Sequence, residues 1–429
     1  MRFIPSQLND VENAEEYIPG GFHPVAIGDI YANGRYKILH KLGFGGSSTV
    51  WLARDYGQNT PHGRLVALKV MCADVSAIAD EKMPELVVPR ALHAIMGSCD
   101  FQIVDHHFLV QGPNGCHRVL AYPLAGPSIR DMVTGSGRIA GSRRLRGDLA
   151  RAVAKQAAMA IRRMHLAGIV HGDLTTSNIL FRVARSVVDW TDDEVYAHLG
   201  LPRSEVVRTF DGSPPGLHAA TKLVESVKLS RLAHLSLIQE RITIIDFGQS
   251  YFIRDPPKDY EPATAIHYQS PEMRFDDRAG AEADVWSLGC AIFEIRSGYP
   301  LFEPLFGSTD IMRQTVETLG RLPDPWWNSF KQRVRWFEDD GEPKDILAQK
   351  QSGVRITARK TSISEKLRSI GDVDEPPSAY EGPMIERCGV KLSEEQVESL
   401  SDLLGRMLKY RPEERPTMEE VIHHRWFNL

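Results

Sequence analysis

The chain has 429 residues, of which 42% are apolar and 25% charged, with a formal net charge of −5. This length suffices for two or three hydrophobic cores, and the acidic balance excludes a chain-wide basic surface for nucleic acid. No run of about 18 apolar residues occurs, and the N-terminal stretch resembles neither a signal nor a transit peptide. Five cysteines without CxxC spacing predict free thiols in a reducing compartment.

Residues 1–33 form an acidic N-terminal extension that contains Pro and Gly. A strand-like alternation follows over residues 36–41. Glycines at 43, 45 and 46 then precede a return strand that begins at Val50. Such a hairpin can close its backbone N–H groups over phosphates. A plain structural hairpin is the alternative when this stretch is taken alone.

The next predicted strand, residues 66–70, is apolar apart from Lys69. A lysine inside an apolar strand is unfavourable unless it is paired, so we expect a carboxylate partner on the partly helical segment 80–95. Glu85 is the candidate, and a solvated surface glutamate is the alternative. Pro89 weakens a regular helix there.

Two further strands are predicted at 101–109 and 119–124, joined by a turn that contains Gly, Pro and Asn. Residues 134–147 are rich in glycine and arginine and predict an exposed loop. The clearest helix follows over residues 148–166, with one apolar stripe and with Asp148 as its N-terminal cap.

The segment 171–180 reads HGDLTTSNIL and lies between two short apolar stretches. It places a carboxylate and an amide five residues apart on one loop. Asp173 can accept the proton of an attacking hydroxyl group, and Asn178 can bind a metal ion. Farther along, residues 242–248 read ITIIDFG, where Asp246 can hold a second metal position.

Two insertions interrupt the chain. Residues 183–238 are polar, with a short helix predicted from 191 to 199 by its capping-box pattern. This insertion suggests a regulatory or docking role, with a passive insertion as the alternative. A helix apolar all round is predicted at 284–293 and should be buried. Residues 303–395 form the second insertion, and its acidic run at 338–342 should be solvated.

In this order, the stretches LGFGGSSTV, VALKV, HGDLTTSNIL and ITIIDFG resemble the motif set of protein kinases. Within the kinases, the chain resembles the SR-protein-specific kinases (the SRPK group), particularly their fungal-type relatives. The segments GGFHPVAIGDIYANGRYKILHKLGFGGSSTVWLARD, GPNGCHRVL and IDFGQSY carry this similarity, together with the insertion before ITIIDFG. The resemblance implies an α+β, two-lobed kinase fold, with a small β-rich lobe at 34–122 and a mainly helical lobe at 123–429.

The resemblance also implies a serine/threonine protein kinase that uses ATP and Mg²⁺. Asp173 would be the catalytic base, Lys69 held by Glu85 would orient the α- and β-phosphates, and Asn178 and Asp246 would hold the metal. The residues implied to surround ATP and its metal are Leu42, Gly43, Gly45, Gly46, Ser48, Val50, Ala67, Lys69, Glu85, Tyr122, Leu124, Asn178 and Asp246.

Family members phosphorylate serines in Arg/Ser-rich segments of splicing factors, which dock on an acidic groove of the large lobe. The resemblance therefore implies a role in the regulation of mRNA splicing. We expect a monomer that binds a protein substrate, without direct nucleic-acid or membrane contact, in the cytoplasm or the nucleus. Two structural roles are also implied: Asp284 would bind the catalytic-loop backbone, and Arg415 would pair with Glu272 of the Ser-Pro-Glu motif at 270–272.

Four positions depart from the usual kinase pattern. Ser48 stands where the third glycine of the phosphate loop is usual, and Gly172 stands in place of the Arg that often reads a phosphorylated activation segment. Thr175 replaces a lysine that touches the transferred phosphoryl group. Gln269 stands where related kinases have Arg, and this departure weighs against carrying over the Arg/Ser substrate class.

Two alternatives stay open. A catalytically weak pseudokinase scaffold is suggested by Ser48 and Thr175, although Lys69, Asp173 and Asp246 are intact. A small-molecule phosphotransferase of the aminoglycoside or choline kinase type is suggested because HGDLxxxNIL is closer to the loop of those enzymes. However, those enzymes lack the Ser-Pro-Glu and DVWSLG elements that this chain contains.

Overall fold

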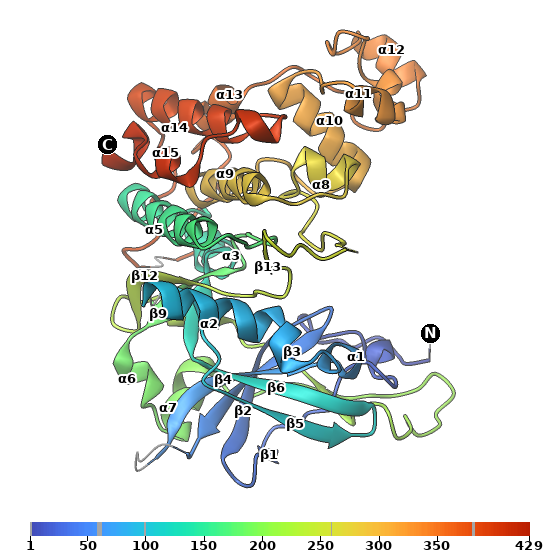
Figure 1. Ribbon diagram of the computed structural model, residues 1–429, viewed down its shortest axis with the longest axis vertical. Helices are drawn as coiled ribbons and strands as arrows, with labels where there is room; N and C mark the ends of the chain where they lie inside the picture. Colours follow the sequence, from blue (N-terminus) through green and yellow to red (C-terminus); the bar gives the residue numbers. More distant parts are fainter. Residues whose placement is uncertain (1, 58–61, 98–99, 259, 380–381) are drawn as a thin grey trace. The chain divides into compact units, whose positions relative to one another are not determined.

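The computed structural model describes residues 2–57, 62–97, 100–258, 260–379 and 382–429, and these form two compact units (Figure 1). Unit 1 comprises Met1–Ala94, Ser98–Pro127 and Leu180–Thr243, and unit 2 comprises Ile95–Gly97, Ser128–Ile179 and Ile244–Leu429. Unit 1 is rich in strands and unit 2 is mainly helical. This division confirms the predicted α+β fold class.

Unit 1 is built on a six-stranded antiparallel sheet of order β1-β2-β3-β4-β6-β5. Its strands are β1 (Ile30–Tyr31), β2 (Tyr36–Gly45), β3 (Ser48–Asp55), β4 (Arg64–Met71), β5 (His106–Gly112) and β6 (Gly115–Pro123). The helices α1 (Ala73–Ser76) and α2 (Pro84–Met96) follow β4. A second sheet of order β12-β9-β7 is formed by β7 (Ala125–Ser128), β9 (Ile179–Val183) and β12 (Ile238–Ile244).

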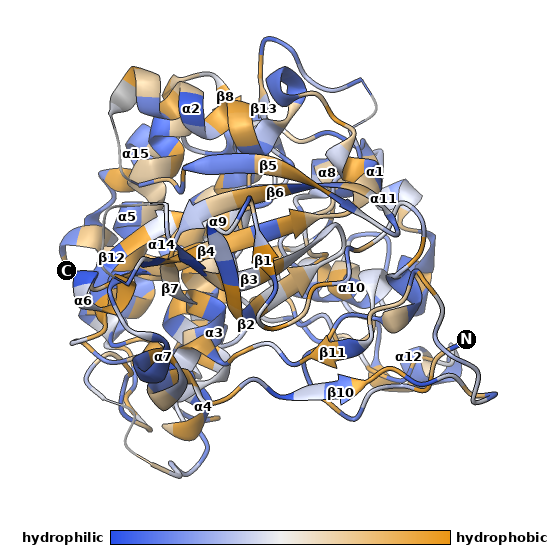
Figure 2. Cartoon of the chain, turned by 90° about the horizontal axis from the view of Figure 1, so that it is seen from below, coloured by the Kyte–Doolittle hydropathy of each residue, from blue (hydrophilic) through white to orange (hydrophobic). Residues whose placement is uncertain are grey.

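The alternation of side chains along β4 divides the core of the sheet in two. Figure 2 shows the strands of this sheet coloured by the hydropathy of their residues. Val66, Leu68 and Val70 enter one buried cluster, whereas Ala67 and Met71 enter another. Because successive side chains of a strand point to opposite faces, Lys69 lies on the second face. The second cluster also contains Met83 and Leu86, which flank Glu85. The strand pattern therefore brings Lys69 to the face that α2 covers.

The insertion at 183–238 belongs to unit 1, whereas the sequence assigns it to the large lobe. It contains α6 (Arg185–Val188), the predicted helix α7 (Asp192–Leu199), and the hairpin of β10 (Ser204–Val206) and β11 (Lys222–Val224). Two ion pairs bind the insertion to the main sheet of unit 1. The buried Arg54 of β3 donates to Asp192 of α7 at 2.7 Å, and Lys37 of β2 pairs with the same carboxylate at 3.0 Å. The capping box of Thr191 and Glu194 confirms how α7 begins.

The N-terminal extension also packs in unit 1. Phe3, Tyr17 and Phe22 share a buried cluster with Val207 and Leu223 of the insertion. The extension and the insertion, far apart in sequence, thus form one layer of the same unit. The lobe boundaries at residues 34 and 122 stay a prediction.

Unit 2 contains most of the helices. They are α3 (Ile129–Thr134), α4 (Ser136–Ile139), α5 (Gly147–Leu166), α8 (Pro271–Phe275), α9 (Ala281–Ser297), α10 (Ser308–Leu319), α11 (Trp326–Ser329), α12 (Ile346–Gln351), α13 (Ile363–Arg368), α14 (Glu394–Met407) and α15 (Met418–Ile422). A short ladder pairs β8 (Ile169–Val170) with β13 (Tyr251–Phe252). Figure 1 shows α9 at the centre of unit 2, and it contacts both α5 and α14. Its residues from Ala283 to Ser297 are buried, which confirms the prediction of a buried helix there.

The prediction of an exposed loop over residues 134–147 is wrong. The segment contains α4, and Ser142, Arg144 and Leu145 are fully buried. Arg144 forms a two-pronged ion pair with Asp374, with N–O distances of 2.5 and 2.9 Å. The same contact shows that Arg144, at the centre of this basic segment, is not solvated. A buried guanidinium needs a carboxylate partner, and here the partner lies 230 residues away.

Three smaller predictions have mixed outcomes. Asp148 does not cap α5, because the helix begins at Gly147 with Arg146 at the cap position, and Asp148 pairs with Arg146 at 2.5 Å. Pro89 lies inside α2, which continues past it. The acidic run at 338–342 is solvated at four of its five residues, as expected.

The second insertion, 303–395, packs around its own aromatic cluster. Trp326, Trp327, Phe330, Trp336 and Phe337 are all buried there. Cys72, Cys116, Cys290 and Cys388 are free thiols, and Cys99 lies outside the described residues. Within the described residues, no helix has the length and apolar character needed to cross a membrane.

Candidate active site

The glycine-rich hairpin of unit 1 joins β2 to β3. Gly43 faces Val50 and Gly45 faces Ser48 across the ladder, so the turn falls at Gly46 and Ser47. A Cβ atom added at Gly43, Gly45 or Gly46 would meet nothing within 4 Å. These glycines are therefore not required by packing, and they leave the backbone bare for a ligand to approach. Ser48 is buried in the ladder rather than exposed at the turn.

Lys69 is paired as the sequence predicts. Its Nζ donates to Oε1 of Glu85, in the first turn of α2. The other carboxylate oxygen of Glu85 accepts a hydrogen bond of 3.0 Å from the hydroxyl group of Tyr122. Glu85 is 3% exposed, so a solvated surface glutamate is ruled out. Tyr122, one of the residues that the resemblance places around ATP, thus also holds the partner of Lys69.

Most of the residues that the resemblance places around ATP lie in unit 1. Ala67 and Tyr122 are buried in one cluster, and Leu42 and Val50 pack against it. Leu124 and Leu42 line a small apolar cavity together with residues of the insertion. Leu42, Val50, Ala67 and Tyr122 thus belong to the same apolar cluster, which also contains Leu86, the residue after Glu85.

The catalytic loop of unit 2 begins at His171, and Asp284 of α9 fixes that point. Its carboxylate accepts the backbone N–H groups of His171 at 2.9 Å and of Gly172 at 3.0 Å, and it accepts a bond of 2.9 Å from Nε2 of His165. Burial alone would raise the pKa of Asp284, but the bonds and charges of His165 and His171 lower it on balance. The role implied for Asp284 is confirmed.

His171 is fully buried, and burial lowers its pKa. Its Nε2 lies 3.2 Å from the carbonyl oxygen of Ile245, and its Nδ1 accepts the backbone N–H of Asp173 at 3.2 Å. These two contacts require a neutral ring that carries its proton on Nε2. The ring thereby ties the backbone of Asp173 to the strand that precedes Asp246.

Asn178 and Asp246 lie near the other end of the loop. The Nδ2 atom of Asn178 donates to the carbonyl oxygen of Asp173 at 2.8 Å and to its carboxylate at 3.1 Å. Because these bonds use the NH₂ group, the amide oxygen is the atom of Asn178 that can serve as a metal ligand. Asp246 has a φ of 64°, a left-handed conformation that is uncommon outside glycine and is often found at functional sites. The backbone N–H of Ile245 donates to the carbonyl oxygen of Asn178 at 3.0 Å, so the two candidate ligand residues are held together.

These donors suit Mg²⁺. A carboxylate and an amide oxygen are the hard ligands that Mg²⁺ accepts, with water and substrate phosphates completing its coordination. Within the described residues, no group of three or more His, Cys, Asp or Glu side chains could hold a metal by itself. The carboxylate of Asp246 and the amide oxygen of Asn178 fit two positions in the coordination shell of a divalent cation.

The sequence reasoning missed two residues that hold the catalytic loop from its other side. The hydroxyl group of Ser250 donates to the carbonyl oxygen of His171 at 2.7 Å, and that of Thr264 donates to the carbonyl oxygen of Gly172 at 2.6 Å. Asp284 accepts hydrogen bonds from the two backbone N–H groups of residues 171 and 172, so all four backbone polar groups of these residues are hydrogen-bonded. Short polar residues in a segment without periodicity give no local signal of such contacts.

The departure at Gly172 has a steric reason. Its φ is 81°, and a Cβ atom there would lie 2.6 Å from both the carbonyl oxygen of Gln249 and the hydroxyl group of Tyr260. No side chain fits at this position, so the arginine that other kinases place there is excluded. The ion pair expected between Arg415 and Glu272 is confirmed, with N–O distances of 2.6 and 2.7 Å and both groups buried.

Comparisons with known proteins agree with this geometry. Residues 234–427 match the family model of the protein kinase domain, and residues 136–197, which include the catalytic loop, match that of the lipopolysaccharide kinase (Kdo/WaaP) family. The fold, the loop geometry and these matches define a protein kinase.

The chain is a serine/threonine kinase similar to the SRPK-type kinases. It is 24% identical over 424 residues to the serine/threonine-protein kinase SRPK of Physarum polycephalum. The aligned region covers 96% of this chain and 90% of the relative. It is 25% identical to the protein kinase dsk1 of Schizosaccharomyces pombe, over 87% of this chain and 81% of the relative. Over 179 residues it is 31% identical to the serine/threonine-protein kinase SKY1 of Saccharomyces cerevisiae, which covers 40% of this chain and 23% of the relative.

Proposed function

We propose that this kinase transfers the γ-phosphoryl group of Mg-ATP to serines in Arg/Ser-rich protein segments, of the kind found in splicing factors. The name of the Physarum polycephalum relative supports the family assignment. The observation that carries the substrate class is a groove in unit 2 with a surplus of carboxylates. The proposal implies residence in the cytoplasm or the nucleus, where such substrates occur.

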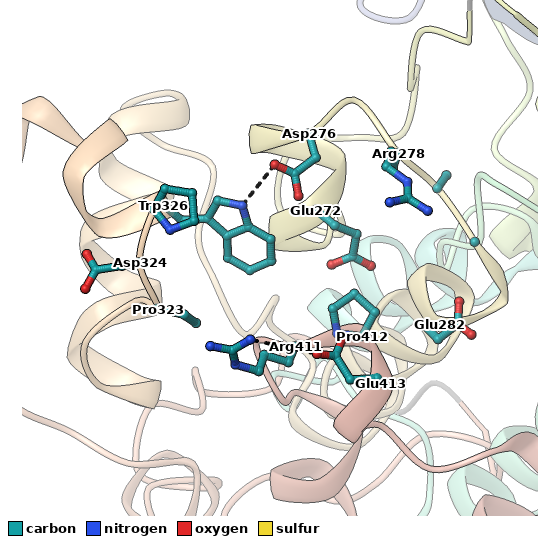
Figure 3. Close-up of a pocket in the computed structure, with 13 residues that line it drawn as sticks. Glu272, Asp276, Arg278, Glu282, Pro323, Asp324, Trp326, Arg411, Pro412 and Glu413 are labelled. Carbon is teal, nitrogen blue, oxygen red and sulfur yellow. Dashed lines mark hydrogen bonds and ion pairs between the residues drawn. The ribbon is translucent and has the colours of Figure 1, made fainter.

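The groove is a cavity of 480 Å³ (Figure 3). Its walls come from the loop between α8 and α9, from the start of α11 and from residues 411–413. Five acidic and two basic side chains line it: Glu272, Asp276, Glu282, Asp324, Glu413, Arg278 and Arg411. The indole ring of Trp326 forms an apolar wall, and its N–H group donates to Asp276 at 3.1 Å (Figure 3).

This arrangement favours a cationic peptide. Among the lining carboxylates, Glu272 is bonded through both oxygens to Arg415, and Asp324 is bonded through both oxygens to Arg321 at 3.2 and 3.4 Å. One oxygen of Glu413 lies 3.9 Å from Arg411. Glu282 and Glu413 are exposed, so an incoming guanidinium can reach them. Arginine can also stack on an indole ring while its guanidinium pairs with carboxylates. An Arg-rich segment fits this combination of charge and aromatic surface.

The chemistry rests on positioning and electrostatics, because the transition state of phosphoryl transfer is loose and spreads negative charge over its oxygens. Bound Mg-ATP supplies the phosphoryl group and the cation. The carboxylate of Asp173 aligns the acceptor hydroxyl group and takes its proton, and a positioned base of this kind contributes typically about 10²–10⁴-fold. Lys69 orients the α- and β-phosphates while Glu85 holds it. Asn178 orients Asp173 and, together with Asp246, offers oxygen ligands.

The test measures phosphoryl transfer from labelled Mg-ATP to an Arg/Ser-repeat peptide and to a generic basic protein, with Asp173→Asn as the control. We expect transfer to the peptide, and loss of transfer in Asp173→Asn with ATP binding retained. Transfer to the generic protein alone would discard the substrate class. ATP binding without transfer to either substrate would favour the scaffold alternative.

The groove has its own test. Each exposed charge pair contributes up to about 1 kcal/mol, so reversing two groove carboxylates in Glu282→Lys/Glu413→Lys should raise the KM for the Arg/Ser peptide roughly 10-fold. The KM for ATP should not change. Glu398→Lys reverses an exposed charge on α14, outside the lining of the groove, and serves as the matched control. Equal KM values for the double variant and the control would exclude the groove.

A small-molecule acceptor is the second candidate, because the lipopolysaccharide kinase model matches residues 136–197. The buried pair of Glu272 and Arg415 argues against it, since this pair belongs to the Ser-Pro-Glu element that such enzymes lack. The same labelled assay with aminoglycoside, choline and lipopolysaccharide-core sugar acceptors separates the two functions.

A further inference from the structure

Thr176 stands in the catalytic loop between Asp173 and Asn178, and its side chain is fully buried. Its hydroxyl oxygen lies 2.9 Å from the hydroxyl oxygen of Tyr268 and 3.2 Å from Oε1 of Glu294. The hydroxyl group of Tyr268 donates to the other carboxylate oxygen of Glu294. Tyr268 and Glu294 are 2% and 4% exposed, so water does not replace these bonds.

The donors and acceptors of this group are complementary. The backbone N–H of Thr176 lies 3.4 Å from the hydroxyl oxygen of Tyr268, which accepts there and donates to Glu294. The hydroxyl group of Thr176 then serves the remaining oxygen of the carboxylate. Burial raises the pKa of Glu294, and the bond from Tyr268, the charge of Arg130 and the bond from Thr176 offset part of this rise. A buried polar network is stable only when its members are satisfied. Here the hydroxyl groups of Thr176 and Tyr268 each donate to one oxygen of the Glu294 carboxylate.

Asp284 and Glu294 both belong to α9, and they bind the catalytic loop at two places: Asp284 at His171 and Gly172, and Glu294 at Thr176. Asp173 lies between these two anchored positions in the sequence.

The same network reaches the segment before α8. The carbonyl oxygen of Tyr268 accepts a bond of 3.0 Å from Ser287 of α9, and the backbone N–H of Arg130 donates to the carbonyl oxygen of Thr176 at 3.2 Å. Thr176 is thus held by its side chain and by both of its backbone polar groups. A threonine that only filled space in the core would not need these bonds.

We propose that Thr176 is a positioning residue for phosphoryl transfer: through Tyr268 and Glu294, its hydroxyl group fixes the catalytic loop at position 176 and so orients Asp173, three residues before it. The hydroxyl group does not touch the reacting atoms. Its removal lowers the rate of the chemical step and leaves nucleotide binding intact, because the candidate nucleotide residues of unit 1 do not depend on it.

The experiment compares three variants of the full chain. Thr176→Val keeps the shape of the side chain and removes the hydrogen bonds of its hydroxyl group, whereas Thr176→Ser keeps the hydroxyl group. Thr315→Val removes a buried hydroxyl group whose bond, 2.8 Å long, goes only to the carbonyl oxygen of Ile311 in its own helix. We expect kcat to fall about 10-fold or more in Thr176→Val, with the KM for ATP within about 2-fold. Thr176→Ser should restore most of kcat, and Thr315→Val should keep it.

The proposal is overturned if Thr176→Val keeps its kcat, if Thr176→Ser is as slow as Thr176→Val, or if Thr315→Val loses as much activity. Tyr268→Phe removes the second hydroxyl group and carries the same prediction should Thr176→Val not fold. A double-mutant cycle adds an independent readout. If the two hydroxyl groups act through one network, Thr176→Val/Tyr268→Phe is about as slow as either single variant, and multiplied losses would contradict the proposal.

Discussion

Replacing Asp284 with Asn changes one oxygen of a buried carboxylate into an NH₂ group. The backbone N–H groups of His171 and Gly172 both donate to this carboxylate, at 2.9 and 3.0 Å. An amide has one oxygen, so one of these donors loses its acceptor and faces another donor. A hydrogen bond to a charged group contributes about 1.5–3 kcal/mol, and an unsatisfied buried donor about as much. We therefore expect the free energy of unfolding to fall by about 2–4 kcal/mol.

The effect can be measured as a shift of Tm together with the initial rate of phosphoryl transfer. For a helical unit of this size, about 1 kcal/mol shifts Tm by roughly 2–4 °C, so the variant should melt roughly 5–15 °C lower. Asp339→Asn changes a side chain that is 99% exposed and is the control. A Tm within about 1 °C of the unmodified protein, with an unchanged rate, would refute the claim that Asp284 holds the catalytic loop.

The same carboxylate predicts a dependence on acid. The pKa of Asp284 is lowered below the usual 3.8 in the folded state, so the unfolded state binds the proton more readily. The stabilisation is therefore complete above the ordinary carboxyl range and is lost as the pH falls through the folded pKa. Asp284→Asn has no such group, so its Tm should differ from that of the unmodified protein less at low pH than at pH 7.

Three further outcomes are expected. Arg144→Met removes the ionic partner of the buried Asp374 side chain and should lower the free energy of unfolding by about 3–5 kcal/mol. Thermal unfolding measures the loss, and Arg368→Met, which breaks an exposed ion pair with Glu394, is the control. Gly172→Ala forces a Cβ to within 2.6 Å of a carbonyl oxygen at a φ of 81°, so transfer should be lost even when Tyr260→Phe is added. His267 has its pKa lowered from 6.5 to about 4 by burial and by nearby Arg charges; the unfolded state therefore takes the proton first, and stability should fall by about 2 kcal/mol between pH 7 and pH 5. His267→Asn should remove that part of the fall in Tm, and an unchanged pH dependence would contradict the assignment.

Local patterns in the sequence were enough to predict the pairing of Lys69 and the burial of the helix at 284–293. Lys69 within an apolar strand requires a partner, and the period of two along β4 faces it toward the helix that carries Glu85. The helix at 284–293 is apolar on every side, which specifies burial without further information. These inferences succeed because each depends on residues close together in the chain or on a spacing that the backbone geometry fixes.

Contacts between distant segments were not predictable in this way. Arg144 looks like part of a solvated basic loop until Asp374 is found beside it. The insertion at 183–238 gives no local sign that Asp192 will pair with Arg54 on β3. In both cases a charged side chain that would favour solvent is fixed by one partner far away in sequence, and only the folded chain shows that partner.

The catalytic loop shows how the departures from the usual kinase pattern fit together. An arginine at position 172 would supply a charged contact for a phosphorylated activation segment, but the left-handed backbone and the neighbouring Gln249 admit only glycine. In its place, Ser250 and Thr264 bond the loop carbonyl groups directly. These bonds connect uncharged groups that are present whether or not the segment is phosphorylated. The loop geometry therefore follows from the fold of unit 2 itself, which is the physical basis for expecting transfer without a phosphate on that segment.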